Sequence, residues 1–453
     1  MRWLFYFSLL IPSFKSIIFT EPDKLFMKKV LIITYYWPPS GGAGVQRWLK
    51  FAKFLPEYGW QPIILTVDPE FASYPQLDES LLDEVDPACM VFTTKSFELY
   101  NFYKLISGKK EVPYGGFANE SKEGLLQKTS KFLRGNFLLP DPRKGWNKYA
   151  LKKAVELIQK FNIETVVTTS PPHSTQLIGL KLKQKFKIRW IADLRDPWTD
   201  IYYYNQFKHT ALARKIDLNY EREVVENADL LITVSEDVKR IFAEKSKLPI
   251  ANKTIVIPNG YDEDDFRINN IPLESKKVIT YSGTISEAYD VDGFLKALSL
   301  INGSMRSEML IRFVGKVPHS IVQKFRSAGF EIELTGYVDH PKSIEFLLRS
   351  DLLLLVIPKV KNNRGILTGK FFEYLASQKR VLAIGPTDGD LAKIIRDTKC
   401  GELFDYEDSE GMVDFIQQNL ASRNSASDTE MAALYSRKKL TQKLAQFLEK
   451  QES

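Results

Sequence analysis

The sequence predicts an α/β protein with two domains, each a doubly wound parallel sheet covered by helices. Short runs of β-branched and aliphatic residues, such as residues 30–35 and 63–67, alternate with segments whose apolar residues recur at helical spacing, such as residues 45–58. The alternation ends at a polar stretch, residues 263–276, and then starts again. Because the chain has 453 residues, it is long enough for two such domains.

The first domain is expected to span residues 27–262. Strands that alternate with helices favour a parallel sheet, because each parallel connection needs a crossover. Residues 95–146, rich in Lys, Gly and Pro, interrupt the alternation, and we interpret them as a basic surface insertion. The expected strands are residues 30–35, 63–67, 165–169, 188–192, 230–234 and 254–257, and the expected helices are residues 45–58, 147–161, 173–186, 209–226 and 236–243.

We interpret residues 263–276 as an interdomain linker and residues 277–428 as the second domain. The acidic run 262–265 is expected to be a solvated hinge. The chain ends in a C-terminal segment, residues 429–453, with a long charged helix expected at residues 429–449. The expected strands of the second domain are residues 278–282, 310–314, 331–334, 352–356 and 381–384, and the expected helices are residues 292–300, 320–328, 343–348, 370–377 and 391–396.

The first segment, residues 1–26, has two interpretations. Residues 3–20 are apolar and aromatic, but Pro12 and Lys15 interrupt them and no small-residue cleavage site follows. This makes a poor signal peptide and a poor membrane span. Met27 directly precedes a predicted strand, so we expect the functional protein to start there. A monotopic membrane anchor is the alternative.

Composition excludes several kinds of site. The two cysteines, Cys89 and Cys400, are too few for a disulfide framework or a four-thiolate zinc site. The four histidines show no metal-binding spacing. We therefore expect a cytoplasmic protein with no resident metal and no cofactor.

The net charge of +7 is concentrated in one region. Residues 101–160 contain 13 Lys and Arg against 5 Asp and Glu, and residues 181–189 form a second basic cluster. Such a surface suits anionic lipid headgroups or a lipid-diphosphate acceptor. A generic solubilising face is the alternative. No nucleic-acid-binding motif accompanies the charge, so nucleic acid is not an expected partner.

A glycine-rich loop follows the first predicted strand. Gly42 and Gly44 free the backbone to approach a phosphate at the N-terminus of the next helix. A dinucleotide-binding fingerprint is the competing interpretation. However, Arg47 stands where close helix–strand packing needs Gly or Ala, and Pro38 and Pro39 lengthen the turn. An NAD-dependent oxidoreductase is therefore disfavoured.

A second anion site is predicted in residues 362–384, which form a loop, a helix and a strand. Thr368, Gly369 and Lys370 lie at the helix N-terminus, where unpaired N–H groups and the helix dipole favour an anion. Glu373 lies one turn further, within reach of a sugar hydroxyl. A solvated Lys–Glu pair is the alternative. The glycine-rich approach and the following strand favour a nucleotide-diphosphate site.

Polar residues also follow the predicted strand 188–192. Ligands of doubly wound sheets bind beyond the carboxyl ends of the strands, so Asp193, Arg195 and Asp196 are expected to face the ligand cleft. His173 opens a predicted helix beside them. We assign His173 and Asp193 to the acceptor side. A structural, loop-capping ion pair is the alternative for Asp193.

Motifs from both halves together indicate a family. They are YYWPPSGGAGVQR (35–47), TSPPHS (169–174), ADLRDPW (192–198), IPNGYDEDDF (257–266), TGYVDHPK (335–342) and TGKFFEYLA (368–376). With these motifs in this order, nearly all of the chain from Met27 onward resembles the retaining GT-B glycosyltransferases of family 4, especially bacterial surface-polysaccharide members.

The resemblance implies two Rossmann-like domains that face each other across a cleft, with the C-terminal helix crossing back. It places the glycine loop and the helix at residues 370–377 against a nucleotide-diphosphate sugar, with Glu373 on the ribose. The donor-binding residues that it implies are Gly42, Gly44, Arg47, Gly283, Thr284, Tyr337, Val338, Thr368, Gly369, Lys370 and Glu373.

The sequence departs from the family pattern at two places. The family carries a glutamate eight positions before the residue matched by Glu373, but here Gly365 occupies that position. Residues 282–290 also lack the family's Arg and Lys. Lys370, with Arg47, Arg195 or Lys316, would then supply the positive charge. A catalytically inactive relative is the alternative.

The activity implied is retaining, metal-independent transfer of a sugar from a nucleotide-diphosphate sugar to a hydroxyl of a lipid-linked or glycan acceptor. Arg195, Asp196 and Lys370 are the expected catalytic residues. The expected setting is surface polysaccharide or glycolipid synthesis, at the cytoplasmic face of an anionic membrane. A non-catalytic sugar-nucleotide-binding or scaffold protein of the same fold is the alternative.

Overall fold

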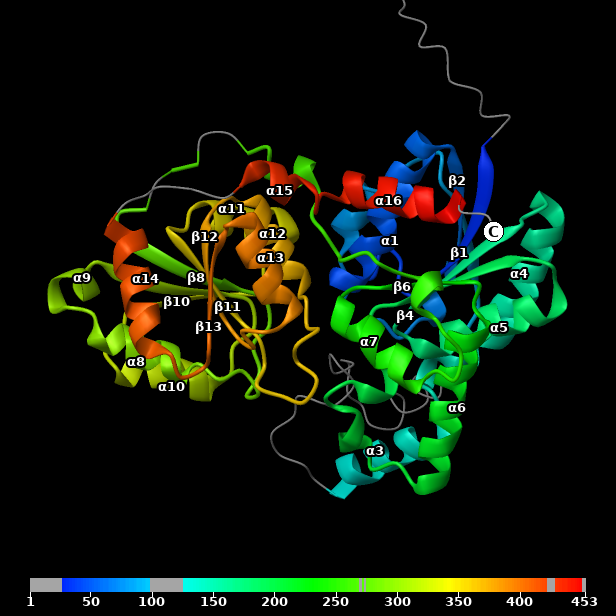
Figure 1. The fold of residues 1–453 in the computed structure, drawn as a ribbon, viewed down its shortest axis with the longest axis horizontal. Helices are drawn as coiled ribbons and strands as arrows, with labels where there is room; N and C mark the ends of the chain where they lie inside the picture. The colour runs from blue at the N-terminus through cyan, green and yellow to red at the C-terminus, as the bar shows by residue number, and fades with distance from the viewer. Residues whose placement is uncertain (1–26, 98–124, 269–270, 273, 422–427, 450–453) are drawn as a thin grey trace, which may run out of the picture.

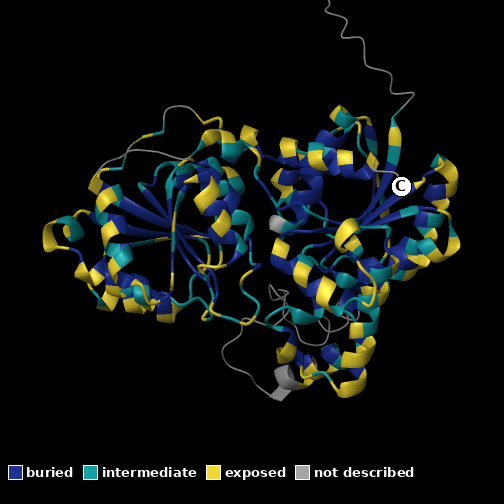
Figure 2. Ribbon diagram, in the orientation of Figure 1, coloured by how far each residue is buried: buried dark blue, intermediate teal, exposed yellow. Residues whose placement is uncertain are grey.

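The computed structural model describes the whole chain except residues 1–26, 98–124, 269–270, 273, 422–427 and 450–453. The interpretation of residues 1–26 lies outside the described residues, as does much of the predicted basic insertion. The chain forms two α/β lobes that lie side by side (Figure 1). The strands of both lobes are the most deeply buried elements (Figure 2).

The first domain is built on a seven-stranded parallel sheet in the order β3-β2-β1-β4-β5-β6-β7. Its inner strands read as continuous apolar runs because helices cover both faces. The strands are β1 (Lys28–Ile33), β2 (Trp60–Val67), β3 (Met90–Thr94), β4 (Thr165–Ser170), β5 (Arg189–Leu194), β6 (Leu230–Thr233) and β7 (Thr254–Val256). The helices are α1 (Ala43–Phe54), α3 (Leu125–Phe137), α4 (Asn147–Phe161), α5 (Gln176–Lys185), α6 (Ala211–Asn227) and α7 (Glu236–Lys245).

The second domain is built on a six-stranded parallel sheet in the order β10-β9-β8-β11-β12-β13. Its strands are β8 (Lys277–Ser282), β9 (Met309–Val314), β10 (Ile332–Gly336), β11 (Leu352–Val356), β12 (Arg380–Ile384) and β13 (Gly401–Phe404). Its helices are α8 (Asp292–Leu300), α9 (Gly303–Ser307), α10 (His319–Ser327), α11 (His340–Leu348), α12 (Gly369–Ala376), α13 (Asp390–Thr398) and α14 (Ser409–Ala421), and the C-terminal segment adds α15 (Thr429–Ala433) and α16 (Arg437–Glu449).

The predicted fold of two doubly wound domains is confirmed. Every predicted strand is present, but β3 and β13 were not predicted. Both lie at a sheet edge and lack the apolar run of an inner strand, because β3 exposes alternate residues and β13 is short and contains Gly401 and Glu402. Helices α3, α9 and α14 were also missed. The single helix expected at residues 429–449 is instead divided into α15 and α16.

Helix α16 crosses back onto the first domain, as expected. Leu440, Leu444 and Leu448 are buried in one cluster with the inner face of α1 and with strands of the first sheet. In Figure 1, α16 lies beside α1 on the lobe that contains β1 and β2. The first domain is therefore completed by the last helix of the chain.

The chain crosses between the lobes twice, and the two crossings are joined. Tyr261 on the outgoing segment forms a parallel bridge with Ser436 on the returning one. The Tyr261 N–H donates to the Tyr435 carbonyl (3.1 Å), and the Arg437 N–H donates to the Tyr261 carbonyl (2.6 Å). Gly260 allows this approach, because its φ is +70° and a side chain there would strike Leu440 and the Tyr435 carbonyl.

The acidic run at the first crossing was expected to be a solvated hinge, but only Glu263 and Asp264 are exposed. Asp262 is 4% exposed, and its carboxylate pairs with Lys50 (2.8 Å) and Lys53 (3.0 Å) of α1. Burial alone would raise the pKa of Asp262, but the two lysines hold it below its ordinary value. The crossing is thus anchored to the first domain by charge.

Truncation of the α16 core contact should destabilise the first domain. We expect Leu444→Ala to lower the free energy of unfolding by about 2–5 kcal/mol, because Leu444 is fully buried. Urea denaturation monitored by tryptophan fluorescence would measure it. Leu434→Ala, at a position that is 53% exposed, is the matched control and should change little. Equal stability of the two variants would contradict the packing of α16 on α1.

Candidate functional site

A cleft of about 520 Å³ lies at the carboxyl ends of both sheets. Strand order reverses between β1 and β4 in the first sheet and between β8 and β11 in the second. Ligands of such sheets bind where the order reverses. The loops after β1 and β4 line the cleft on one side, and residues 362–368, between β11 and α12, line it on the other. Both domains therefore contribute to one site.

The N-terminus of α1 opens into this cleft. Gly42 caps the helix with φ +97° and offers no side-chain hydrogen bond, so the first N–H groups of α1 are not capped by a side chain. Gly44 lies against Arg195, whose Nη1 donates to the Gly44 carbonyl (2.9 Å). A Cβ at Gly44 would lie 3.2 Å from that nitrogen, so a larger residue here would press on the guanidinium.

The second domain brings Lys370, Gly283 and Thr284 together. The Lys370 ammonium donates to the Tyr281 hydroxyl (2.7 Å), which in turn donates to the Thr284 carbonyl (3.1 Å). Gly283 has φ +104°, and a Cβ there would lie 2.9 Å from Lys370 Nζ. Burial lowers the pKa of Lys370 to about 7. Lys370 is partly buried and forms no ion pair with a described residue, so it can meet an anionic ligand, whose charge would raise its pKa.

Thr368 stands at the N-terminus of α12 and lines the cleft. Its Oγ1 is buried, and no described residue lies within hydrogen-bonding distance of it. It makes no capping bond to its own helix. The first N–H groups of α12, beginning with Gly369, therefore have no side-chain cap and can meet a ligand.

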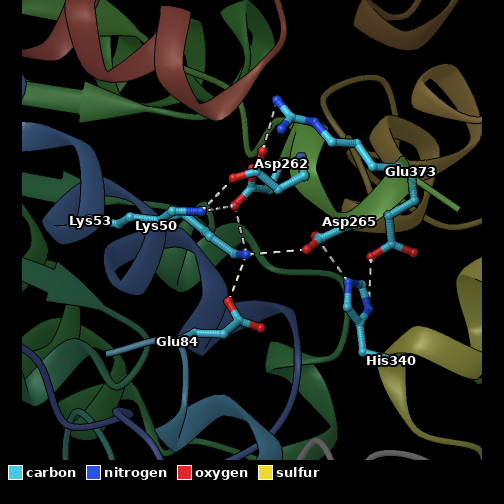
Figure 3. A network of polar contacts seen from close by, with 9 residues as sticks. Lys50, Lys53, Glu84, Asp262, Asp265, His340 and Glu373 are labelled. Atoms are coloured by element: carbon cyan, nitrogen blue, oxygen red, sulfur yellow. Dashed lines mark hydrogen bonds and ion pairs between the residues drawn. The ribbon is translucent and has the colours of Figure 1, made fainter. Parts of the chain in front are cut away.

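Glu373 lies apart from the large cleft. Together with Gly369 and Arg437 it lines a small space between α1, α12 and α16. Its Oε1 is 3.9 Å from Nδ1 of His340, whose Nε2 is 3.2 Å from Asp265. Figure 3 shows this chain of contacts continuing to Lys50 of the first domain.

The electrostatics of this chain favour a charged His340. Burial raises the pKa of Glu373. Burial would lower the pKa of His340, but the contacts with Asp265 and Glu373 raise it overall. Glu373, which the family resemblance places on the ribose, is thus connected through His340 and Asp265 to the segment that crosses between the domains.

Arg47 and Asp193 do not face the cleft as we expected. Both side chains have no exposed surface, and the guanidinium binds the carboxylate through Nε (3.2 Å) and Nη2 (3.0 Å). Nη1 donates to the Pro258 carbonyl (3.0 Å). The structural alternative considered for Asp193 fits these contacts, and Arg47 carries no charge that is free to meet a donor phosphate.

Arg195 lines the cleft, but its donors already bind backbone. Nε donates to the Ser170 carbonyl (2.8 Å) and Nη2 to the Pro171 carbonyl (3.2 Å), in addition to the bond to Gly44. Arg195 therefore shapes the glycine loop. Asp196 also lines the cleft, and burial raises its pKa.

His173 lines the same wall with its ring stacked on Trp198 (4.6 Å between centroids). Burial, and then the charge of Arg195, lower its pKa to about 3, so the imidazole is neutral at pH 7. Nδ1 is buried, and no described residue lies within hydrogen-bonding distance of it. Because Nδ1 has almost no accessible surface, only the exposed part of the ring can contact a substrate.

The sequence interpretation missed the aromatic wall of the cleft. Trp198 and the run 202–204 line it, together with Tyr36 and Phe207. The available signal was the aromatic run that follows the motif ADLRDPW.

Tyr337 and Val338, which were assigned to the nucleoside base, lie after β10 and do not line either described space. Tyr337 is 55% exposed.

Close contact between the domains explains Gly365. A Cβ at this position would lie 2.9 Å from Ser235 Oγ and 3.0 Å from Asp237 Cβ, both at the start of α7 in the first domain. A glutamate there would strike α7.

Among the described residues no group of His, Cys, Asp or Glu is arranged to hold a metal ion, and no described helix is long and apolar enough to cross a membrane.

Two protein-family models match the sequence of this protein, one in each domain. Residues 117–265 match the model of Glycosyltransferase Family 4, and residues 262–438 match that of Glycosyl transferases group 1. The protein belongs with the GT-B glycosyltransferases. No curated protein sequence gives a significant match. The two models meet at the first crossing, so each family model accounts for one face of the cleft.

Solved structures show the same fold at low identity. Sucrose-phosphate synthase from Thermosynechococcus elongatus is 17% identical (TM-score 0.59; 93% of this chain and 98% of that chain covered). HepE from Anabaena in complex with UDP is 13% identical (TM-score 0.59; 93% and 99% covered). WaaG, a glycosyltransferase involved in lipopolysaccharide biosynthesis, is 14% identical (TM-score 0.53; 93% and 100% covered).

Removal of the buried carboxylate of Asp193 should destabilise this glycosyltransferase strongly. Asp193→Asn leaves the Arg47 guanidinium buried without a counter-charge, so we expect a loss of about 3–5 kcal/mol in the free energy of unfolding. Asp388→Asn removes an exposed carboxylate that pairs with Arg364, and it should cost less than about 1 kcal/mol. Urea denaturation of both variants provides the comparison. Unaltered stability of Asp193→Asn would show that the pair is not structural.

Proposed function

We propose that the protein transfers a sugar from a nucleotide-diphosphate sugar to a hydroxyl acceptor with retention of configuration, in surface polysaccharide or glycolipid synthesis. The observation that carries the proposal is the position of Lys370, at the open N-terminus of α12 and against Gly283. HepE is described in complex with UDP and with UDP-glucose, and WaaG as acting in lipopolysaccharide biosynthesis. These relatives support the donor class and the setting.

The donor diphosphate would lie between the N-termini of α1 and α12. As the bond from the anomeric carbon to the phosphate oxygen breaks, negative charge grows on the diphosphate, and helix N–H groups and Lys370 are already oriented to stabilise it. The acceptor oxygen forms the new bond on the same face, and its proton passes to the departing phosphate oxygen. This step needs neither a protein nucleophile nor a resident metal.

The acceptor would lie against the aromatic wall of the first domain. Tyr202 and Tyr203, which are partly exposed on this wall, offer apolar ring surfaces that suit the faces of sugar rings. His173, whose ring is partly exposed on this wall, can contact an acceptor hydroxyl. Asp196, on the same wall, can accept a second hydroxyl.

Lys370 and Glu373 should serve the donor differently. Lys370→Ala should lower kcat more than it raises the donor KM, because the phosphate charge grows in the transition state. Glu373→Gln should mainly raise the donor KM, because a ribose is bound equally before and during the reaction. Each contact should contribute about 1.5–3 kcal/mol. Nucleotide release from a panel of sugar nucleotides would be measured at steady state.

The matched controls are Lys342→Ala and Glu345→Gln, an ion pair of the same spacing on the surface of α11. They should leave both kinetic constants unchanged. Wild-type kinetics in folded Lys370→Ala and Glu373→Gln would show that the nucleotide is not held here. Donor binding without any turnover would favour the non-catalytic alternative.

We also propose peripheral contact with an anionic membrane at the cytoplasmic face. Helix α3 lies within the basic segment 101–160. Three of its apolar residues, Phe132, Leu133 and Phe137, are 42%, 49% and 74% exposed. Exposed apolar side chains can insert into a lipid interface, while the basic charge of the segment attracts anionic headgroups.

Vesicle sedimentation tests this contact. The protein should bind phosphatidylglycerol vesicles and not phosphatidylcholine vesicles, and 0.5 M salt should weaken binding because exposed charges are screened (Debye length ~10 Å at 0.1 M). Phe137→Ser should reduce binding, whereas Phe97→Ser, at a position that is 66% exposed outside α3, should not. Binding that is insensitive to both salt and Phe137→Ser would contradict the proposal.

A further inference from the structure

Arg437 is a buried arginine that the proposed mechanism does not use. It is the first residue of α16, at the second crossing between the domains, and it is 4% exposed. Its side chain passes over Gly260, where a Cβ would lie 3.6 Å from Arg437 Cδ. The first domain thus directs a guanidinium toward the second domain.

This guanidinium lacks a hydrogen-bonding partner. Nη1 is buried, and no described residue lies within hydrogen-bonding distance of it. The carboxylates of Asp262 and Asp265 lie in the surroundings, but both are held by Lys50. Burial and the nearby Arg47 lower the pKa of Arg437 to about 9. A buried guanidinium nitrogen without a hydrogen-bonding partner is costly for a fold, so it points to a bound molecule.

Arg437 and Glu373 line the same small space, of about 20 Å³, beside Gly369. A space of ~10–15 Å³ holds one water, so a single oxygen-sized group fits here. A guanidinium can only donate hydrogen bonds, and an ionised carboxylate can only accept them. A hydroxyl matches both, because it accepts from one and donates to the other. A phosphate oxygen would be repelled by Glu373.

We propose that Arg437 and Glu373 together bind one hydroxyl of the donor ribose, with Arg437 donating to the oxygen and Glu373 accepting its proton. The proposal rests on the donor site described above and adds a binding residue, Arg437, that belongs to the first domain. The ribose is then bound by both domains, and the site selects ribonucleotides over nucleotides that lack this hydroxyl.

Calorimetric titration tests the proposal. UDP, GDP and ADP identify the nucleotide that the wild-type protein binds, and its 2′-deoxy and 3′-deoxy forms are then compared. Loss of one of these hydroxyls should weaken wild-type binding about 10- to 100-fold. Arg437→Gln should bind the ribonucleotide about 10- to 100-fold more weakly, and its preference for the hydroxyl should shrink to a few-fold.

The outcomes separate this proposal from the one that it rests on. If the wild type binds none of the three diphosphates, the donor site itself is wrong. If it binds but does not distinguish either deoxy form, the space holds only a water and the proposal is overturned. If Arg437→Gln keeps both its affinity for the ribonucleotide and its preference over the deoxy forms, Arg437 does not bind the ribose.

The melting temperature without nucleotide shows whether Arg437 is a nucleotide-binding residue or a structural one. Without nucleotide, Arg437→Gln should melt at the same temperature as the wild type or higher, because it removes a buried guanidinium nitrogen that has no hydrogen-bonding partner. Lys438→Gln, the same change of charge at the next residue, breaks only an exposed pair with Glu57 and should keep both affinity and preference. A lower melting temperature of Arg437→Gln with unaltered preference would indicate a structural role and overturn the proposal.

Discussion

The Asp193 carboxylate is the interaction on which the first domain's half of the site depends. It accepts hydrogen bonds from Arg47, from Trp48 Nε1 (2.7 Å) and from Thr169 Oγ1 (2.8 Å). It thereby joins α1, β4 and β5 at the point where strand order reverses. Arg47 extends the connection to Pro258, just before the first crossing. The helix after the glycine loop and the start of the linker are therefore held to the first sheet through one buried charge.

The repeat of strand and helix was readable from the sequence because inner parallel strands are apolar throughout, as in the fully buried run of β11. The same reasoning missed β3 and β13, since these edge strands lack that apolar run. Lys370 was found because a loop, a helix N-terminus and a strand are local in sequence. The partners of Arg47 and Asp262 were not predictable, because each is far away in the chain and the pairing exists only in the fold.

Arg437 shows a second limit of sequence reasoning. In the sequence it is one cation in a charged helix, and such residues are usually solvated. Only the return of α16 to the first domain, beside Tyr261, buries it next to Glu373. The positive charge missing from residues 282–290 was expected from Lys370, together with Arg47, Arg195 or Lys316. The fold places Arg437, which was not among them, on the other side of α12.

Because α16 belongs to the core of the first domain, that domain is discontinuous in the chain. During synthesis, residues 28–256 emerge early, but the apolar surface of α1 that Leu440, Leu444 and Leu448 cover stays open until the last helix leaves the ribosome. The second domain is complete before then, since its sheet ends at β13. The later-encoded domain can thus fold first, and closure of the first domain is the final step that assembles the cleft.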